Sequence, residues 1–264
     1  MQLATDKMLF EKADGIGWMT FNNPERRNAI SYEMRLAMLQ ILDDFEADDA
    51  VRVVVMKGAG DKAFVSGSDI SQFESRRATE EQQREYAERS EALQARFETM
   101  QKPLIAMIQG FCLGAGLGTA LNADLRIASD DAQFGLPAAR LSLGYPYPGI
   151  KKLMDIVGPA RTKDILFTAR RIGAAEAYQM GLVNRVVPRA EIEEAVRETA
   201  ATIAGNAPLT VRASKLIVAE ALKNPADRDL GRCDAAVRAC MASDDFKEGR
   251  RAFMEKRRPA FSGR

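Results

Sequence analysis

The sequence predicts an α/β protein, with a mixed core over residues 1–200 and a helical region over residues 201–264. Two observations lead to this class. Short runs rich in β-branched residues alternate with helical patterns up to about residue 149, and beyond it the pattern is mainly helical. The chain has 264 residues, of which 46% are hydrophobic, so it is long enough to bury a sizeable core.

The N-terminal elements are the most clearly marked. Residues 8–13 and 16–22 predict two strands around Asp14-Gly15, a pair that favours a type I′ hairpin because both central residues need positive φ. Ser31 is the expected N-cap of the helix that follows. Residues 51–56 predict the next strand. The apolar side of the helix comprises Met34, Met38, Ile41, Leu42 and Phe45.

The middle and the end of the chain continue this alternation. Residues 71–101 predict a solvated helix whose narrow apolar stripe is Phe73, Tyr86, Leu93, Phe97 and Met100. Residues 104–108 and 125–128 predict two buried strands. Later helices are expected over residues 150–157, 161–168, 174–180, 191–204, 208–222, 229–241 and 245–256.

The composition excludes several kinds of chemistry. Lys and Arg total 38 against 37 Asp and Glu, and this net charge of +1 argues against a general nucleic-acid binder. The sequence has no histidine, which removes Ser-His-Asp and Cys-His nucleophiles, histidine bases and imidazole metal sites. Any chemistry must therefore use carboxylates, phenols, lysines, hydroxyls or backbone dipoles, and we expect no metal.

Cysteine usage points to a reducing compartment. Cys112, Cys233 and Cys240 are odd in number and lack CxxC spacing, so neither a disulfide framework nor a cysteine metal site is expected. The first residues carry no apolar signal segment, and the longest apolar runs are too short to cross a bilayer. We therefore expect a cytoplasmic protein without a membrane partner.

Three loops, at residues 63–69, 110–118 and 143–149, lie where a strand or a turn meets a helix. Free N–H groups are available at such places. The second loop reads Gly114-x-Gly116-x-Gly118, which is neither the GxGxxG nor the Walker spacing, so a nicotinamide-dependent oxidoreductase gains little support. Alone, these glycines are best explained by close packing of a strand–helix turn.

Together, six segments resemble the enoyl-CoA hydratase/isomerase (crotonase) superfamily, in the same order and over nearly the whole chain. Such a series is far more specific than any one segment. The segments are Asn23-Pro24-Glu25-Arg26-Arg27-Asn28-Ala29-Ile30, Phe64…Ser66-Gly67-Ser68-Asp69, Pro103-Leu104-Ile105-Ala106…Gly110…Gly114-Ala115-Gly116, Ala132-Gln133-Phe134-Gly135-Leu136-Pro137, Gly181-Leu182-Val183-Asn184, and Phe246…Glu248-Gly249…Ala252-Phe253…Lys256-Arg257.

The resemblance implies a spiral of ββα units whose C-terminal helices make trimer contacts, hence a homotrimer or a dimer of trimers. It also implies an acyl-CoA thioester substrate, with coenzyme A as part of the substrate and no separate cofactor. The thioester oxygen would be held by the backbone N–H groups of Ser68 and Ala115. Such preorganised donors are suited to a developing enolate oxygen.

The same resemblance assigns coenzyme A contacts to Arg26, Ser66, Asp69 and Ile70, and to Lys256 from a neighbouring C-terminus. Plainer explanations compete with these roles. Arg26 and Lys256 can equally be explained as solvated basic residues on the surface. Asp69 is better explained as a carboxylate that fixes its loop than as an acid catalyst.

The chain departs from the hydratase pattern at both proton-transfer positions. Gly118 and Ala138 replace the two glutamates, so hydration by two carboxylates is not supported. The stretch around Tyr145 looks like malonyl-type acyl-CoA decarboxylases of the superfamily, in which a tyrosine contributes to the site. Loss of CO₂ itself generates the enolate, so that reaction needs an oxyanion site and a proton donor. Tyr145 is the candidate donor, and Arg140 is a weaker candidate for attracting the carboxylate.

Several functions stay open at this point. Decarboxylation of a malonyl-type CoA comes first, and enoyl-CoA isomerisation or an atypical hydration comes second. The rival from another class is a non-catalytic acyl-CoA-binding protein on the same fold. The catalytic candidates are Ser68, Ala115 and Tyr145.

Overall fold

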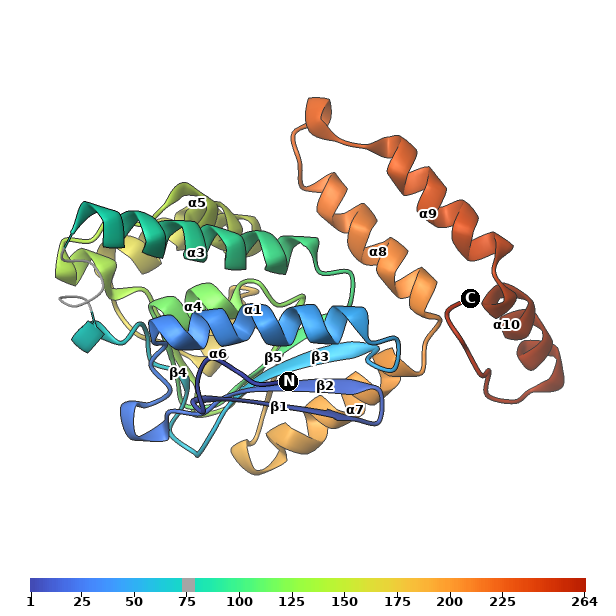
Figure 1. Ribbon diagram of the computed structural model, residues 1–264, viewed down its shortest axis with the longest axis horizontal. Helices are drawn as coiled ribbons and strands as arrows, with labels where there is room; N and C mark the ends of the chain where they lie inside the picture. Colours follow the sequence, from blue (N-terminus) through green and yellow to red (C-terminus); the bar gives the residue numbers. More distant parts are fainter. Residues whose placement is uncertain (73–78) are drawn as a thin grey trace.

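The computed structural model describes residues 1–72 and 79–264 and confirms the α/β class (Figure 1). A six-stranded sheet has the order β1-β2-β3-β5-β7-β10, and a four-stranded sheet has the order β4-β6-β8-β9. The strands are β1 (Met8–Ala13), β2 (Ile16–Phe21), β3 (Val53–Gly58), β4 (Ala63–Val65), β5 (Leu104–Ile108), β6 (Phe111–Leu113), β7 (Leu125–Ser129), β8 (Gln133–Gly135), β9 (Ile172–Gly173) and β10 (Arg185–Val187).

The N-terminal hairpin forms as predicted. β1 and β2 pair antiparallel, and Asp14 and Gly15 between them have φ values of 53° and 78°, the two positive angles that the turn requires. The remaining neighbours in the large sheet pair in parallel. Parallel strands are covered on both faces, which explains why β3 and β5 are almost continuously apolar and buried.

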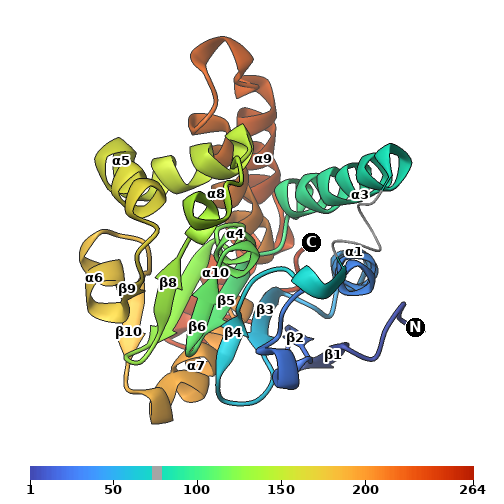
Figure 2. The same ribbon diagram turned by 90° about the vertical axis from the view of Figure 1, so that its left-hand side faces the viewer.

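The small sheet was not part of the prediction, which treats residues 63–69 and 110–118 as loops. β6 pairs in parallel with β4 on one side and β8 on the other (Figure 2). These strands have three residues each, so no alternation of apolar residues marks them. Successive strand pairs, β3 with β4, β5 with β6 and β7 with β8, each give one strand to each sheet and then a helix. This repeat confirms the predicted spiral of ββα units.

Most helices begin and end close to the predicted bounds, but the helix predicted over residues 71–101 begins only at Glu80 of α3, and residues 70–72 form a short 3-10 helix instead. Ser31 caps α1, because its Oγ accepts the Met34 N–H at 3.2 Å. The two helices predicted between residues 150 and 168 are present as the two halves of α5, which Gly158 separates because its φ of 79° and ψ of 166° are not helical. Phe73 of the predicted apolar stripe lies outside the described residues. The helices are α1 (Tyr32–Ala47), α3 (Glu80–Thr99), α4 (Ala115–Ala120), α5 (Tyr147–Thr168), α6 (Ala174–Gln179), α7 (Ile192–Ala204), α8 (Pro208–Ala221), α9 (Leu230–Ala242) and α10 (Asp244–Glu255).

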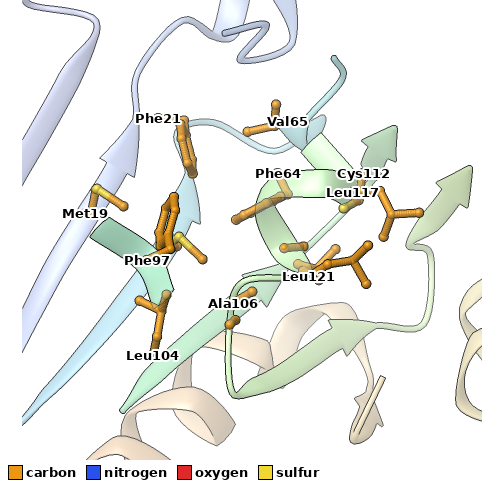
Figure 3. Close-up of a cluster of buried hydrophobic side chains, with 14 of the residues drawn as sticks. Met19, Phe21, Phe64, Val65, Phe97, Leu104, Ala106, Cys112, Leu117 and Leu121 are labelled. Carbon is orange, nitrogen blue, oxygen red and sulfur yellow. The ribbon is translucent and has the colours of Figure 1, made fainter. Parts of the chain in front are cut away.

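The main core joins the two sheets to α1, α3 and α4. Figure 3 shows part of it, with side chains from the two sheets, α3 and α4. Phe21 and Phe64 meet edge to face in it, with ring centroids 5.3 Å apart. Cys112 on β6 and Leu117 on α4 are fully buried in the same cluster. These contacts hold α4, which begins within the second loop, against the small sheet.

A second apolar cluster covers the other face of the large sheet. Trp18, the single tryptophan of the chain, lies in it and is only 3% exposed. α7 supplies the facing side chains, among them Ile192 and Val196. The sheet is thus enclosed on both faces.

The last three helices and the tail that follows them form an arm that projects from the core (Figure 1). We call residues 208–264 the C-terminal arm. α8 packs against α9, and α10 contacts α9. Asp245 ties the tail to α10, because its carboxylate accepts the N–H groups of Ser262 and Gly263 at 2.7 and 2.8 Å. The division of the chain into domains at residue 200 stays a prediction.

Candidate active site

Ser68 lies on the loop that follows β4. Ile30 fixes this loop, because it donates its N–H to the Gly67 carbonyl at 2.8 Å and accepts the Asp69 N–H at 2.9 Å. Gly67 has a φ of 137°, a conformation that residues with side chains rarely adopt. Between these bonded positions, the Ser68 N–H has no acceptor among residues 1–72 and 79–264. The loop therefore presents one free backbone donor.

Ala115 is the first residue of α4. The preceding Gly114 has a φ of 52° and donates its N–H to the Gly135 carbonyl at 2.8 Å. The Ala115 N–H has no acceptor within its helix, as is general for a first helical residue, and no other group in the described part of the chain accepts it. Gly116 leaves no room for a side chain, since a Cβ there would lie 2.0 Å from the Val65 carbonyl oxygen.

The two loops lie against each other. A Cβ built on Gly114 would be 3.8 Å from the Cα of Gly67, and one built on Gly67 would be 3.8 Å from the Leu113 carbonyl oxygen. The free N–H groups of Ser68 and Ala115 thus belong to neighbouring segments, each one residue beyond a glycine. Unpaired backbone N–H groups are the kind of donor that stabilises an oxyanion.

Tyr145 occupies the space beside Gly118. A Cβ on Gly118 would lie 3.0 Å from the Tyr145 hydroxyl oxygen, so the phenol stands where a side chain at position 118 would project. The ring also packs on Gly149, where a Cβ would meet it at 2.7 Å. Burial raises the pKa of Tyr145, although the charge of Arg35 opposes this rise. The hydroxyl is therefore protonated at neutral pH and can donate a hydrogen bond.

The other residues of this stretch are more open. Ala138, the second position of departure, is half-buried on the 3-10 helix η3 (Pro137–Leu141). Arg140 on the same helix is exposed, and Tyr147 is 75% exposed. Tyr145 is therefore the tyrosine of this stretch that packs beside the second glycine loop.

Arg26 connects two of the predicted coenzyme A contacts, since its side chain binds the Asp69 carboxylate and its backbone carbonyl accepts the Ser66 hydroxyl. Arg26 Nη1 donates to both oxygens of Asp69 at 2.8 and 3.0 Å, and the Ser71 hydroxyl donates to it at 2.7 Å. Burial alone would raise the pKa of Asp69, yet these hydrogen bonds and the Arg26 charge hold it below its ordinary value. Asp69 is thus an ionised, loop-fixing carboxylate. Ser66 donates its hydroxyl to the Arg26 carbonyl at 3.3 Å, and Ile70 is 61% exposed.

Lys256 lies apart from these residues. It is the exposed C-cap of α10, in the C-terminal arm and distant from β4 and α4 in Figure 1. The Lys256 side chain can therefore reach the candidate site only of a neighbouring subunit. The sequence analysis predicts a contact of this kind, from a neighbouring C-terminus.

Sequence reasoning missed Arg35, which lies one turn into α1. Its Nη2 donates to the Ser68 Oγ at 3.3 Å, and its Cζ lies 5.2 Å from the centroid of the Tyr86 ring on α3. The available signal was a cation next to the buried Met34 on an apolar helix. Helical periodicity cannot show which loop such a residue faces, and so the contact with Ser68 was not foreseen.

Other reactive groups near the site are few. Cys112 is fully buried, and burial raises the pKa of its thiol far above the usual range, so the thiol is unreactive. Within the described ranges, no group of three or more Cys, Asp or Glu side chains is placed to hold a metal ion. No described helix combines the length and apolar character needed to cross a membrane.

A spiral of ββα units whose strands alternate between two sheets defines a class of proteins, the crotonase fold. Comparison with known proteins narrows this class. The sequence model of the enoyl-CoA hydratase/isomerase family matches residues 11–264. The chain therefore belongs to this family, whose members act on acyl-CoA thioesters.

Individual relatives are similar to this chain over almost its full length. The crotonyl-CoA hydratase of Syntrophomonas wolfei is 34% identical over 259 residues, which cover 98% of this chain and 99% of that protein. The carnitinyl-CoA dehydratase of Escherichia coli K12 is 32% identical, covering 93% and 94%. The crystal structure of an enoyl-CoA hydratase/carnithine racemase from Magnetospirillum magneticum superposes with a TM-score of 0.93 at 33% identity, covering 98% of this chain and 97% of that one.

Proposed function

We propose that the chain is an enzyme that stabilises a thioester enolate between the N–H groups of Ser68 and Ala115. We propose further that its reaction is the decarboxylation of a malonyl-type acyl-CoA. The first part rests on the acyl-CoA chemistry of the family and on the two free donors. The second part rests on the side chains around them.

The observation that carries the reaction is the contact between Tyr145 and Gly118. The hydroxyl lies 3.0 Å from the place of a Cβ at position 118, so the volume that a hydratase fills with a carboxylate is filled here by a phenol. A phenol with a raised pKa is a poor base at neutral pH, but it can give a proton to a carbanion. The site therefore suits a reaction that makes its own carbanion.

Decarboxylation is such a reaction. The bond between the α-carbon and the carboxylate carbon breaks, CO₂ leaves, and the electron pair passes into the thioester as an enolate. The enolate oxygen accepts the N–H groups of Ser68 and Ala115. A proton then adds to the α-carbon from the Tyr145 hydroxyl, which regains one from water. Each backbone donor is expected to lower the free-energy barrier of this step by about 3 kcal/mol.

Two alternatives have some support. The names of the relatives favour hydration or the related isomerisation, but these need a base that positions 118 and 138 do not supply. A non-catalytic acyl-CoA-binding protein would use the same two N–H groups without turnover. Both alternatives keep the acyl-CoA ligand.

We propose the following setting for the site. Arg26, Ser66, Asp69 and Ile70 contact coenzyme A, joined by Lys256 from the next subunit of a homotrimer or a dimer of trimers. The half-exposed Arg26 and the apolar groove of the C-terminal arm, described below, support this arrangement. Three free cysteines suit a reducing cytoplasm.

The reaction is tested by incubating the protein with malonyl-, methylmalonyl-, crotonyl- and 3-hydroxybutyryl-CoA and following the products by mass spectrometry. We expect loss of CO₂ from a malonyl-type ester, with one deuterium incorporated at the α-carbon in D₂O. Hydration of crotonyl-CoA would replace the proposed reaction, and binding of every ester without turnover would favour the non-catalytic protein. Binding of NAD without coenzyme A would contradict both.

The donors are tested by Ala115→Pro. Proline is tolerated at the first position of a helix but has no N–H, so one donor is removed while α4 is retained. We expect kcat to fall about 100- to 1000-fold. Ala115→Gly keeps the N–H and is the matched control. Tyr145→Phe should slow turnover and deuterium incorporation; an unchanged rate would remove Tyr145 from the mechanism.

A further inference from the structure

Arg35 is a partly enclosed cation beside the candidate oxyanion site. It projects from the first turns of α1, where one guanidinium nitrogen, Nη2, donates to the Ser68 hydroxyl at 3.3 Å. The plane of the group lies near the Tyr86 ring, with Cζ 5.2 Å from its centroid. A serine hydroxyl and an aromatic face orient the guanidinium, but neither neutralises its charge.

The guanidinium also has hydrogen-bonding capacity that the protein does not use. Its Nε is buried and has no hydrogen-bond partner, and no carboxylate in the described part of the chain forms an ion pair with it. On the same two helices, α1 and α3, the Glu85 carboxylate accepts the Tyr32 hydroxyl at 2.7 Å and the Glu33 carboxylate accepts Gln72 Nε2 at 3.0 Å. An enclosed guanidinium N–H without an acceptor is costly unless a ligand supplies one.

Other enclosed cations of this chain are satisfied by the protein itself. Arg126 donates to the backbone carbonyls of Leu182 and Ala123, and Lys102 donates to those of Phe45 and Asp48. These four contacts fix strand and helix ends. Within the described ranges the Arg35 guanidinium donates to no backbone carbonyl; its contacts are the Ser68 hydroxyl and the Tyr86 ring.

Ser68 connects this cation to the reacting atoms. The proposed function assigns the Ser68 N–H to the thioester oxygen, and the hydroxyl of the same residue is bonded to Arg35. We propose that Arg35 selects acyl-CoA substrates whose acyl group carries a carboxylate close to the thioester carbonyl. The inference rests on the proposed acyl-CoA site, and it names the substrate class of that site as short dicarboxylic acyl-CoA esters.

The position of Arg35 also suits a charge that moves. In decarboxylation the negative charge starts on the carboxylate and ends on the thioester oxygen, which is held by the residue bonded to Arg35. A guanidinium close to both the carboxylate and the thioester oxygen attracts the substrate. It also stays near the negative charge as the bond to CO₂ breaks. Arg35 is thus a specificity-determining residue, and its removal should affect KM more than kcat.

Binding of stable analogues tests the inference without turnover. S-(2-carboxyethyl)-CoA is malonyl-CoA without its carbonyl oxygen and cannot decarboxylate. S-(2-carbamoylethyl)-CoA has the same shape and a neutral amide. Isothermal titration calorimetry gives the ratio of the two Kd values for each variant, and damage to the rest of the coenzyme A site cancels in this ratio.

We expect the wild-type protein to prefer the carboxylate about 10- to 100-fold. Arg35→Gln and Arg35→Met should bring the ratio close to one, and Arg35→Lys should keep part of it because the charge remains. Arg84→Gln, which removes an exposed cation from α3, is the matched control and should leave the ratio unchanged.

A wild-type ratio near one, or a ratio that survives Arg35→Gln, overturns the inference. So does a ratio that is lost on Arg140→Gln instead. If malonyl-CoA is not decarboxylated but the ratio depends on Arg35, the proposed reaction fails and the inference stands. If neither analogue binds the wild-type protein, the acyl-CoA site and the inference fail together.

Discussion

The strands of the core enclose their apolar side chains, whereas the helices of the C-terminal arm expose theirs. Phe21 and Phe64 are fully buried, but Phe253 and Met254 on α10 are 83% and 81% exposed. These two lie on an apolar groove of about 770 Å³ between α8, α9 and α10. The core thus encloses its apolar side chains within one subunit, while the arm carries exposed apolar surface, and its coverage by a further copy of the chain is part of our proposal.

The largest effect is expected in the core. Phe64→Ala removes a ring that contacts Phe21 edge to face, and the cavity should cost about 3–5 kcal/mol of the free energy of unfolding. Urea unfolding followed by far-UV circular dichroism measures it. Phe167→Ala, at a ring that is 76% exposed on α5, is the control and should cost no more than about 0.5 kcal/mol. Equal losses would contradict the assignment of the core.

The next effect concerns the arm. Phe253→Asp places a charge on the exposed apolar groove, and we expect self-association to weaken by about 2 kcal/mol or more, roughly 30-fold. Sedimentation velocity over a series of concentrations measures the shift from trimer to monomer. The helix content should not change, because the side chain is free in one subunit. A wild-type protein that sediments as a monomer would end the argument for trimers.

A smaller effect is expected beside Tyr145. Gly118→Ala brings a methyl group to within 3.0 Å of its hydroxyl, so the ring must shift, at a cost of about 1–3 kcal/mol. Tyr145→Phe removes the hydroxyl and should relieve this cost, giving a coupling of about 1 kcal/mol in a double-mutant cycle of unfolding. Gly144→Ala is the control, since nothing lies within 4 Å of its added Cβ. Additive effects would mean that the two residues do not touch.

The smallest effect is a difference in acid sensitivity. Hydrogen bonds from Arg257, the Ala260 N–H and Arg251 hold the pKa of Glu248 well below its ordinary value of 4.5. A lowered pKa stabilises the arm above pH 4.5, and this stabilisation is lost as the pH falls below it. Circular dichroism at 222 nm should therefore change before the fluorescence of Trp18, which reports on the core. Glu248→Gln should remove this separation; coincident transitions in the wild-type protein would contradict it.

The sequence predicts five of the six strands of the large sheet and most of the helices because their signals are local; the three-residue strand β10 was not predicted. The Asp14-Gly15 turn and the Ser31 cap depend on a few adjacent residues, and the structure confirms both. The small sheet could not be predicted in the same way. β4 and β6 have three residues each, and they become strands only because the spiral brings them side by side.

The residues of the candidate site also differ in whether local sequence signals could identify them. Ser68, Ala115 and Tyr145 could be named from motifs, and the structure brings the two loops and the phenol into one region; their catalytic roles stay proposals. Arg35 could not be named, since its contact with Ser68 crosses 33 positions of sequence. Long-range side-chain contacts of this kind leave no periodic trace.

Gly116 fixes one part of the candidate site and leaves another part free to vary. Its backbone touches that of Val65, so the spacing between the segments that bear the two N–H groups is set by main chain alone. Arg35 contacts the Ser68 side of this frame and Tyr145 lies beside Gly118, but neither side chain is part of it. They can be exchanged to change the acyl group or the proton route while the oxygen-binding frame stays where it is.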